Sequence, residues 1–331
     1  MIKILHRYIA IDNVCAWPVL LKDPKSDDLY AIIHNSPSHG WHEGSLDCYK
    51  SEDGGHFWTK QGTPAPHDPG ENRIHIAAGW DHENNMIVLS NGFKPDLEKK
   101  NRGIVRGIWC SSSSDFGKSW KLIRDVKGAI EVDDQIPFGR IHSLVDKQLI
   151  ATFYRPFSKE DSQTWSGIST DRGKNWLNHT ALVNGKDGNE CCLLPLNEDC
   201  KILAATRTHM DHHVDISRSL DSGKSWHTEQ AVTLGMQHPA DLTKLKNGNI
   251  LLTYAIRNKG MTSIAFRRSI DHGKSWKSPG CIIDLPHARD FGYPSTVQLS
   301  DETLITAYYL SNSENHNRYH MGVVRWSIKY E

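Results

Sequence analysis

An eight-residue pattern, Ser-x-Asp-x-Gly-x-x-Trp, occurs five times in this chain and constrains its fold more than any other feature. The copies span residues 51–58, 113–120, 169–176, 219–226 and 269–276. Successive copies are 62, 56, 50 and 50 residues apart, counted from Asp to Asp. Self-similarity at this period is typical of propeller blades rather than of shorter solenoid repeats. The octapeptide therefore predicts a repeating β architecture.

The residue types of the octapeptide indicate a hairpin turn. Ser and Asp side chains can bond nearby backbone N–H groups, and Gly accepts a positive φ without steric cost. The Trp then re-enters a strand, where its large apolar surface can pack between sheets. The Asp residues resemble those of a calcium loop, but no EF-hand spacing follows them, so we predict a structural element and no metal.

A second pattern precedes the octapeptides and consists of a strand, a short polar turn and another strand. It is clearest at 190–207, 238–257 and 293–309, and earlier copies start near Ala16, Arg73 and Arg140. Six such units and five octapeptides predict an all-β, six-bladed β-propeller that forms one domain over residues 1–331. The segment 2–9 is expected to supply the missing strand of the last sheet and to close the ring.

Charge and cysteine content exclude several classes of protein. The chain has 39 basic and 39 acidic residues and no Lys/Arg-rich block, which argues against nucleic acid or an anionic membrane as partner. Seven Cys without framework spacing are expected to be free thiols. Neither a secretory leader nor an apolar run of membrane-spanning length is visible, so as written the chain is expected to be cytoplasmic, or exported if it was trimmed.

Five such octapeptides in a six-unit propeller resemble the sialidase superfamily along nearly the whole chain. The resemblance extends to residues at the ends of the inner strands. The family pairs a Glu that opens one blade with an Arg that closes its second strand, as Glu190 and Arg207 do here. A second Arg closes the next blade, at Arg257, and a nucleophilic Tyr opens the last blade, at Tyr293.

The chemistry that the resemblance implies is retaining hydrolysis of an acidic sugar. A Tyr nucleophile avoids the repulsion that a carboxylate would meet at an anomeric centre bearing its own carboxylate, and sialidases use Tyr in this way. Glu190 would remove the proton of Tyr293. Arg207 and Arg257 are expected to bind the substrate carboxylate and to lower the pKa of Tyr293.

Two departures from the family pattern concern the first blade. The family's Arg-Ile-Pro is replaced by Ala16-Trp17-Pro18, so one arginine of the clamp is absent, and Arg73 or Arg140 are the candidates to replace it. No Asp stands where the family's general acid is expected. We expect Glu43 or His39 to act as the acid.

The same loop contains further candidates. Trp41 is suited to stack against a sugar face or to pack within the loop, and Asp47 is expected to be structural. Several histidines lie at predicted ends of inner strands, and each of them alone is expected to be structural. Together they are candidates to bind sugar hydroxyls or shuttle protons, and a metal is discounted: His75, His142, His209, His212, His213 and His238.

Three functions remain open on the sequence. The leading hypothesis is an exo-acting retaining glycoside hydrolase that removes a terminal acidic sugar, sialic acid or a relative, from a glycan without a cofactor. The second is a lyase acting on a uronate-containing polysaccharide, in which Arg neutralises the carboxylate and His or Tyr removes the C5 proton. The third is a glycan-binding propeller without turnover.

Overall fold

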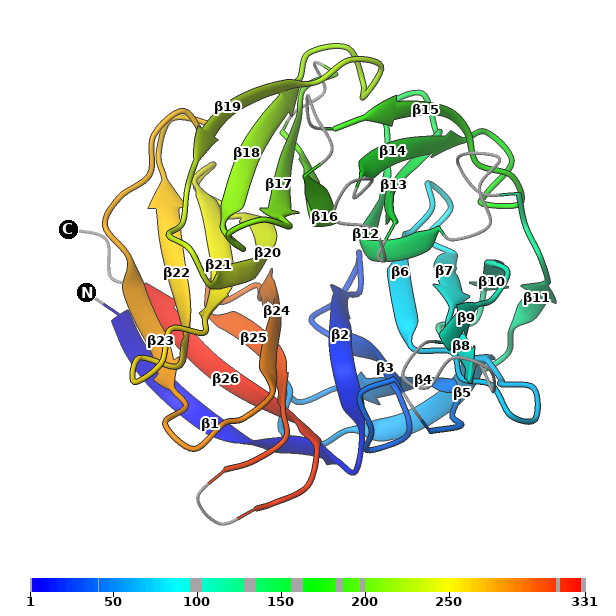
Figure 1. The fold of residues 1–331 in the computed structure, drawn as a ribbon, viewed down its shortest axis with the longest axis horizontal. Helices are drawn as coiled ribbons and strands as arrows, with labels where there is room; N and C mark the ends of the chain where they lie inside the picture. The colour runs from blue at the N-terminus through cyan, green and yellow to red at the C-terminus, as the bar shows by residue number, and fades with distance from the viewer. Residues whose placement is uncertain are drawn as a thin grey trace.

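The chain folds into β-strands arranged around a common centre, and no helix occurs in the part that the structure describes (Figure 1). The computed structural model describes residues 2–40, 42–95, 103–127, 135–155, 163–182, 187–196, 200–313 and 316–328. Within those ranges, no helix has the length and apolar character needed to span a bilayer. The prediction of an all-β fold is confirmed.

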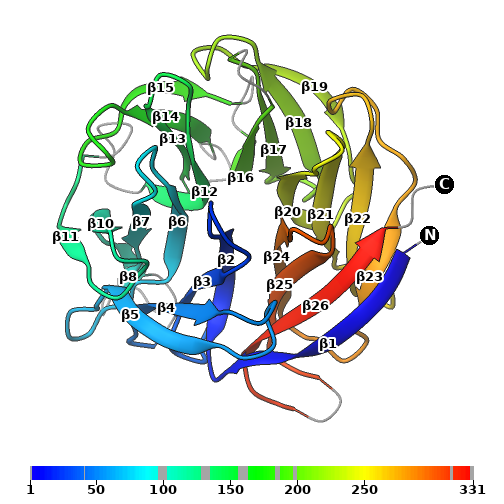
Figure 2. The ribbon, with the colours of Figure 1, turned by 180° about the vertical axis from the view of Figure 1, so that it is seen from behind.

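The strands form antiparallel units of four, and in each unit they follow one another from the centre outward (Figures 1 and 2). The first three units are β2 (Cys15–Lys22), β3 (Leu29–His34), β4 (Leu46–Ser51), β5 (Thr59–Ala65); β6 (His75–Trp80), β7 (Met86–Asn91), β10 (Trp109–Ser113), β11 (Lys121–Ile123); and β12 (Ile136–Ser143), β13 (Leu149–Tyr154), β14 (Thr164–Ser169), β15 (Leu177–Ala181). A hairpin of β8 (Phe93–Pro95) and β9 (Gly103–Val105) lies between β7 and β10 in sequence.

The remaining strands repeat this order in the second half of the chain. They are β16 (Gly188–Pro195), β17 (Ile202–Thr208), β18 (Val214–Ser219), β19 (His227–Ala231); β20 (Gln237–Lys244), β21 (Ile250–Ile256), β22 (Ser263–Ser269), β23 (Gly280–Asp284); and β24 (Phe291–Gln298), β25 (Leu304–Leu310), β26 (His320–Ile328), β1 (Ile2–Asp12). The N-terminal strand thus lies at the outer edge of the C-terminal sheet, paired antiparallel with β26 from Ile2↔Ile328 to Asp12↔His320.

One pair of neighbouring units shares a continuous sheet. β6 and β12 pair in parallel through Ala77, Ala78 and Gly79, which joins their units into an eight-stranded sheet. Gly79 permits this approach, because a Cβ at that position would lie 1.9 Å from the carbonyl oxygen of Ile141. A glycine is therefore required where the two inner strands meet.

The octapeptide forms a turn closed by its own side chains, as the copy at 169–176 shows. The Ser169 hydroxyl donates to Asp171 Oδ1 at 2.8 Å and accepts from the Gly173 N–H at 2.8 Å. Asp171 Oδ1 also accepts from the Asn175 N–H at 2.9 Å, and the Trp176 indole donates to the Gly173 carbonyl at 3.1 Å. These four hydrogen bonds are local and engage the Ser and Asp side chains, so the motif builds structure rather than a ligand site.

The Trp of each octapeptide packs into apolar clusters that lie between neighbouring units. Trp176 is fully buried among residues of both the β6 and the β12 units, including Leu89 and Phe153. The clusters join each unit to the next, because no single sheet buries both of its faces alone.

Replacing Trp176 by Ala is expected to lower the free energy of unfolding by about 3–5 kcal/mol, because the largest side chain of this cluster would leave a cavity. Denaturant unfolding measures the loss. Phe57→Ala is the matched control in the first octapeptide, since Phe57 is 80% exposed and its removal leaves no cavity. Equal midpoints for Trp176→Ala and the wild type would contradict the packing role.

Candidate active site

The predicted nucleophile and base lie in direct contact at the central end of two inner strands. The Tyr293 hydroxyl, on β24, donates to Glu190 Oε1 at 2.5 Å, although 103 residues separate them in sequence. The other oxygen of Glu190 accepts from Arg207 Nη1 at 2.7 Å. Glu190 therefore links the phenol to a guanidinium, in an arrangement suited to receive the phenolic proton.

Irregular strand registers help to explain how these side chains converge. The pairing of β16 with β17 shifts between Gly188 and Cys191, and that of β24 with β25 shifts between Gly292 and Ser295. Such bulges insert an unpaired residue and re-aim side chains near functional sites. Glu190 lies within the first bulge, and Tyr293 lies within the second.

The protonation state of Tyr293 corrects one expectation. Burial and the adjacent Glu190 carboxylate raise the pKa of Tyr293 well above its ordinary value, although Arg207 and Arg257 oppose this shift. The two arginines thus reduce the rise in the pKa of Tyr293, but the pKa remains above its ordinary value. Tyr293 is a neutral phenol in the free protein, and its reaction requires proton transfer to Glu190.

Arg257 lies on the other side of Tyr293. Its Nη2 donates to the Phe291 carbonyl at 2.6 Å, and its guanidinium carbon is 5.6 Å from the centroid of the Tyr293 ring. No carboxylate among the described residues forms an ion pair with Arg257. This cation is thus available to an anionic ligand, whereas the charge of Arg207 is shared with Glu190.

His238 is buried beside both arginines. Its ring lies 5.2 Å from that of His212, and its Nδ1 has no hydrogen-bond partner among the residues described. Burial, together with the positive charges of Arg207 and Arg257, lowers the pKa of His238. His238 is therefore neutral, and the structure places it near the two arginines as expected for a substrate-binding candidate.

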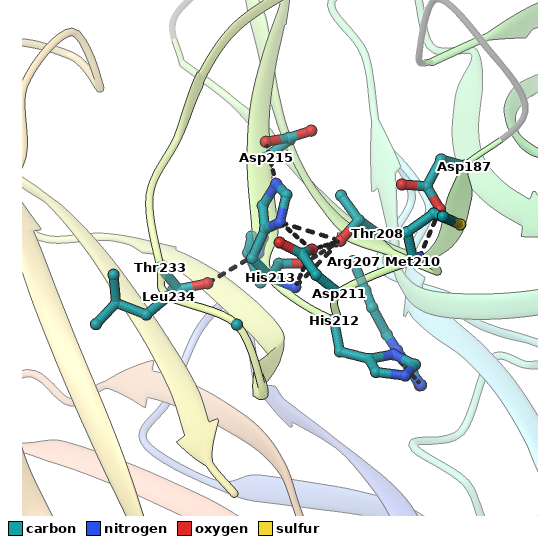
Figure 3. Close-up of polar contacts among 12 residues, drawn as sticks. Asp187, Arg207, Thr208, Met210, Asp211, His212, His213, Asp215, Thr233 and Leu234 are labelled. Atoms are coloured by element: carbon teal, nitrogen blue, oxygen red, sulfur yellow. Dashed lines mark hydrogen bonds and ion pairs between the residues drawn. The ribbon is translucent and has the colours of Figure 1, made fainter. Parts of the chain in front are cut away.

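The loop after β17 brings a histidine against Arg207, and Figure 3 shows its polar contacts. Arg207 Nη2 donates to His212 Nδ1 at 3.2 Å. The next residue, His213, points to other partners, Asp211 and Asp215, the latter at 2.9 Å from Nε2. Burial alone would lower the pKa of His213, but these carboxylates raise it. The adjacent histidines thus face different partners, as expected for residues near a strand.

His39 lies across an aromatic cluster from Glu190. Its Nδ1 is 2.6 Å from Asp290 Oδ2, and its ring meets Trp17 edge-on with centroids 5.2 Å apart. Trp17 in turn lies 5.4 Å from the Tyr293 ring and stacks on His75 at 5.2 Å. Trp17 therefore connects the predicted acid to the predicted nucleophile.

Two residues of this site were not found from the sequence. Trp17 belongs to the triplet that replaces the family's Arg-Ile-Pro. Trp17 and Ala16 both have a positive φ, 54° and 52° respectively. Asp290 accepts hydrogen bonds from the Tyr309 and Tyr319 hydroxyls, each at 2.7 Å. Only the three-dimensional fold brings Asp290 to His39, 251 residues away in sequence.

The two arginines proposed to complete the clamp differ in their surroundings. Arg73 is 2% exposed, lies 3.3 Å over the Trp109 ring and donates to the Gly107 carbonyl at 2.9 Å. Arg140 donates to Asp241 Oδ2 at 2.9 Å and to the Thr296 carbonyl at 2.5 Å. The burial of Arg73 argues against contact with substrate. Arg140 pairs with Asp241 but also lines the cavity that Trp17 and Tyr293 border, so its role in substrate binding stays a prediction.

Two of the predicted histidines also have internal roles. His75 Nδ1 pairs with Asn91 Oδ1 at 2.9 Å, and His142 Nε2 with the Leu193 carbonyl at 2.8 Å. Burial lowers the pKa of His75 to about 3 and that of His142 to about 4. His75 supports the site through Trp17, and His142 packs against the neighbouring unit.

The other candidates of the first-blade loop are separated from Tyr293 or lie outside the described residues. Glu43 accepts from the Gly70 N–H at 2.9 Å and is 3.5 Å from His67, so it faces a different segment. Asp47 accepts from Thr63 at 2.7 Å and from Asn35 at 3.0 Å, as a structural residue would. Trp41 lies outside the described residues.

Solved structures with this fold include sialidases. A protein of unknown function from Dyadobacter fermentans is 17% identical with a TM-score of 0.82, and the match covers 99% of both chains. A Hadza microbial sialidase is 14% identical with a TM-score of 0.75, over 96% of this chain and 68% of its own. Trypanosoma rangeli sialidase in complex with sialic acid is 15% identical with a TM-score of 0.70, over 95% and 54%.

These similarities establish the fold of the chain as sialidase-like. No curated protein matches its sequence. The family model of the BNR repeat-like domain matches residues 93–306, which is more than half of the chain and includes four of the five octapeptides. The chain therefore belongs to the BNR repeat-like domain family.

Proposed function

We propose that this protein is an exo-acting retaining glycoside hydrolase that removes a terminal acidic sugar from a glycan, built on a six-bladed propeller. The observation that carries the proposal is the hydrogen-bonded chain from Tyr293 through Glu190 to Arg207, with distances of 2.5 and 2.7 Å. A buried Tyr bonded to a carboxylate is the activated nucleophile that an anomeric centre bearing a carboxylate requires.

The reaction follows from this geometry. Tyr293 Oη attacks the anomeric carbon while its proton passes to Glu190 Oε1, and the aglycone leaves. Arg207 holds Glu190 in place and stabilises the carboxylate until the proton arrives. Water then attacks the anomeric carbon and displaces Tyr293, whose oxygen regains its proton from Glu190. The proton that water loses replaces the one that the departing aglycone takes up. Because each displacement inverts the anomeric carbon, the product keeps the configuration of the substrate.

The charge of the site supports an anionic substrate. Arg257 has no acidic partner in the described chain, and the neutral His238 beside it adds no charge of either sign. A sugar carboxylate would offset the unpaired guanidinium through two parallel hydrogen bonds. Sialic acid and other acidic sugars with one carboxylate near the anomeric carbon meet this requirement.

The contact between Tyr293 and Glu190 favours hydrolysis over the lyase alternative. A lyase needs a base for the C5 proton but no nucleophile paired with a carboxylate. Incubation with aryl glycosides of acidic sugars and with uronate-containing polysaccharides separates the two. We expect release of the aryl alcohol and no unsaturated product that absorbs in the ultraviolet. Appearance of the unsaturated product alone would overturn the hydrolase proposal, and binding without turnover would indicate a lectin-like propeller.

Arg257→Ala is expected to lower kcat/KM for the acidic substrate by about 2–5 kcal/mol in transition-state free energy, because a buried carboxylate would lose its charged partner. The methyl ester of the same substrate carries no charge and should lose much less. Arg172→Ala, at an exposed position of an octapeptide, is the matched control. An equal loss for acid and ester would contradict carboxylate binding by Arg257.

A further inference from the structure

His39 and Asp290 form a second hydrogen-bonded pair of side chains at the site, in addition to the pair of Tyr293 and Glu190. His39 lies in the loop between β3 and β4, and Asp290 lies directly before β24. The His39 side chain is 38% exposed, while its Nδ1 is 2.6 Å from the carboxylate. One ring nitrogen is thus engaged, and the ring remains open to an incoming ligand.

The partners of Asp290 determine which nitrogen of His39 carries the exchangeable proton. Asp290 accepts from the hydroxyls of Tyr309 and Tyr319, each at 2.7 Å. Burial would raise the pKa of Asp290, but these bonds and the one to His39 lower it to about 2. An ionised carboxylate only accepts, so Nδ1 of His39 must donate, and Nε2 is left to bind and release the proton.

The position of the pair relative to Tyr293 fits a group that acts on the leaving oxygen. The His39 ring is 5.2 Å from Trp17 and 6.0 Å from Tyr309. The Tyr293 ring is 5.4 Å from Trp17 and 5.7 Å from Tyr309. Both rings therefore border the same two aromatic side chains, whereas Glu43, the other candidate acid, is held toward Gly70 and His67.

We propose that His39 is the general acid and base of the hydrolysis and that Asp290 is the residue that positions it. This inference rests on the proposed glycoside hydrolase function. Such a role for a His–carboxylate pair uses the carboxylate to fix the tautomer and to stabilise the imidazolium, without taking the proton itself.

The proton transfers balance in both steps. In the first step, the glycosidic C–O bond breaks as Nε2–H of protonated His39 gives its proton to the leaving oxygen, and the bond from Tyr293 to the anomeric carbon forms. In the second step, neutral Nε2 takes a proton from water as the water oxygen attacks the anomeric carbon. The bond to Tyr293 breaks, and His39 returns to the protonated form.

Among the described residues, Asp290 is the ionised group in contact with His39. The groups that face it are Asp290, the hydroxyl-bearing Tyr309 and Tyr319, Trp17, and His75 behind Trp17. Burial keeps His75 neutral by lowering its pKa to about 3. Asp290→Asn therefore removes the negative charge that holds the imidazolium and leaves the shape of the site nearly unchanged.

The test compares two substrates with the same acidic sugar, an aryl glycoside and a disaccharide. An aryl oxide leaves without protonation, whereas a sugar alkoxide requires it. His39→Ala is expected to lose about 10²- to 10⁴-fold in kcat/KM on the disaccharide. On the aryl glycoside it should release one equivalent of aryl alcohol in a fast burst and then turn over slowly, because the second step lacks its base. Azide, a nucleophile that needs no base, should restore steady turnover.

Asp290→Asn should show the same substrate dependence with a smaller loss, and His42→Asn, an exposed residue of the same loop, should resemble the wild type. Melting curves identify any variant that fails to fold. If either His39→Ala or Asp290→Asn fails, the substrate dependence of the other variant tests the proposal. Equal losses of His39→Ala on both substrates, without burst or azide rescue, would overturn the role of His39. Leaving-group dependence in Glu43→Gln instead would reassign it. A wild type inactive on both substrates would overturn the hydrolase function itself.

Discussion

Tyr293→Phe is expected to reduce turnover of an acidic-sugar glycoside by about 10³- to 10⁶-fold, the range seen when a covalent nucleophile is removed. Only the hydroxyl is lost. The ring keeps its contacts with Trp17 and Phe138, whose centroids lie 5.4 and 5.8 Å away. Glu190 keeps its bond to Arg207 at 2.7 Å, so no unpaired buried charge is created. The fold should therefore survive while the reaction stops.

Tyr254→Phe is the matched control for this prediction. Tyr254 is 1% exposed in the apolar cluster between the β16 and β20 units and has no role in the site. Steady-state rates and melting temperatures are measured for both variants. If Tyr293→Phe turned over at the wild-type rate, or lost activity only in proportion to a lowered melting temperature, the nucleophilic role would be excluded.

Acidification from pH 7 to pH 5 is expected to destabilise the protein by several kcal/mol. Burial lowers the pKa of His34 to about 4, of His75 to about 3 and of His142 to about 4. Because the unfolded chain takes up these protons near pH ~6.5, each such histidine contributes stability above that pH and loses about 1.4 kcal/mol per unit below it. The loss of stability from each histidine continues until the pH falls to the pKa of that histidine in the folded protein.

One histidine acts in the opposite direction. Asp211 and Asp215 raise the pKa of His213 although burial opposes them. Its contribution is present below pH ~6.5 and is lost as the pH rises through the folded value, so it offsets part of the acid loss. The buried neutral histidines outnumber it and should determine the net slope.

Denaturant midpoints at pH 7 and pH 5 test this prediction. His75→Gln should reduce the difference between the two midpoints, because one buried titrating group is removed, and His227→Gln at an exposed position should leave it unchanged. A wild-type midpoint that stays constant between pH 7 and pH 5 would contradict the neutral burial of these histidines.

The sequence was informative where the relevant interactions are local or ordered along the repeat. The octapeptides predicted the turns because the hydrogen bonds of their Ser and Asp side chains lie within the octapeptide. Glu190, Arg207 and Tyr293 were predicted to meet because Glu190 and Tyr293 open the first strands of their units and Arg207 closes the second strand of the Glu190 unit. The structure brings these three together within hydrogen-bond distance.

The sequence was misleading where side-chain direction depends on register. Arg73 and Arg140 both begin an Arg-Ile-His triplet, yet Arg73 precedes β6 and Arg140 lies inside β12. A shift of one position along a strand moves a side chain to the opposite face of the sheet. Arg73 therefore stacks on Trp109, and Arg140 pairs with Asp241.

Asp290 could not be predicted because its contacts are long-range. Its partners His39, Tyr309 and Tyr319 come from other segments, and nothing in the Arg-Asp-Phe sequence around it marks a site. Trp17 was overlooked for a different reason, since the missing arginine at Ala16 drew attention to charge, whereas the neighbouring Trp17 contributes ring surface. With that arginine absent, Arg257 is the cation of the site that lacks an acidic partner among the described residues.

Trapping the covalent intermediate tests directly whether Tyr293 is the nucleophile. A fluorinated acidic glycosyl fluoride, which forms the intermediate quickly and hydrolyses slowly, is incubated with the protein, and the labelled peptide is identified by mass spectrometry. We expect one added sugar per chain, located on Tyr293, and no label on Tyr293→Phe. A label on Glu190, or turnover of natural substrate with no label on Tyr293, would contradict it.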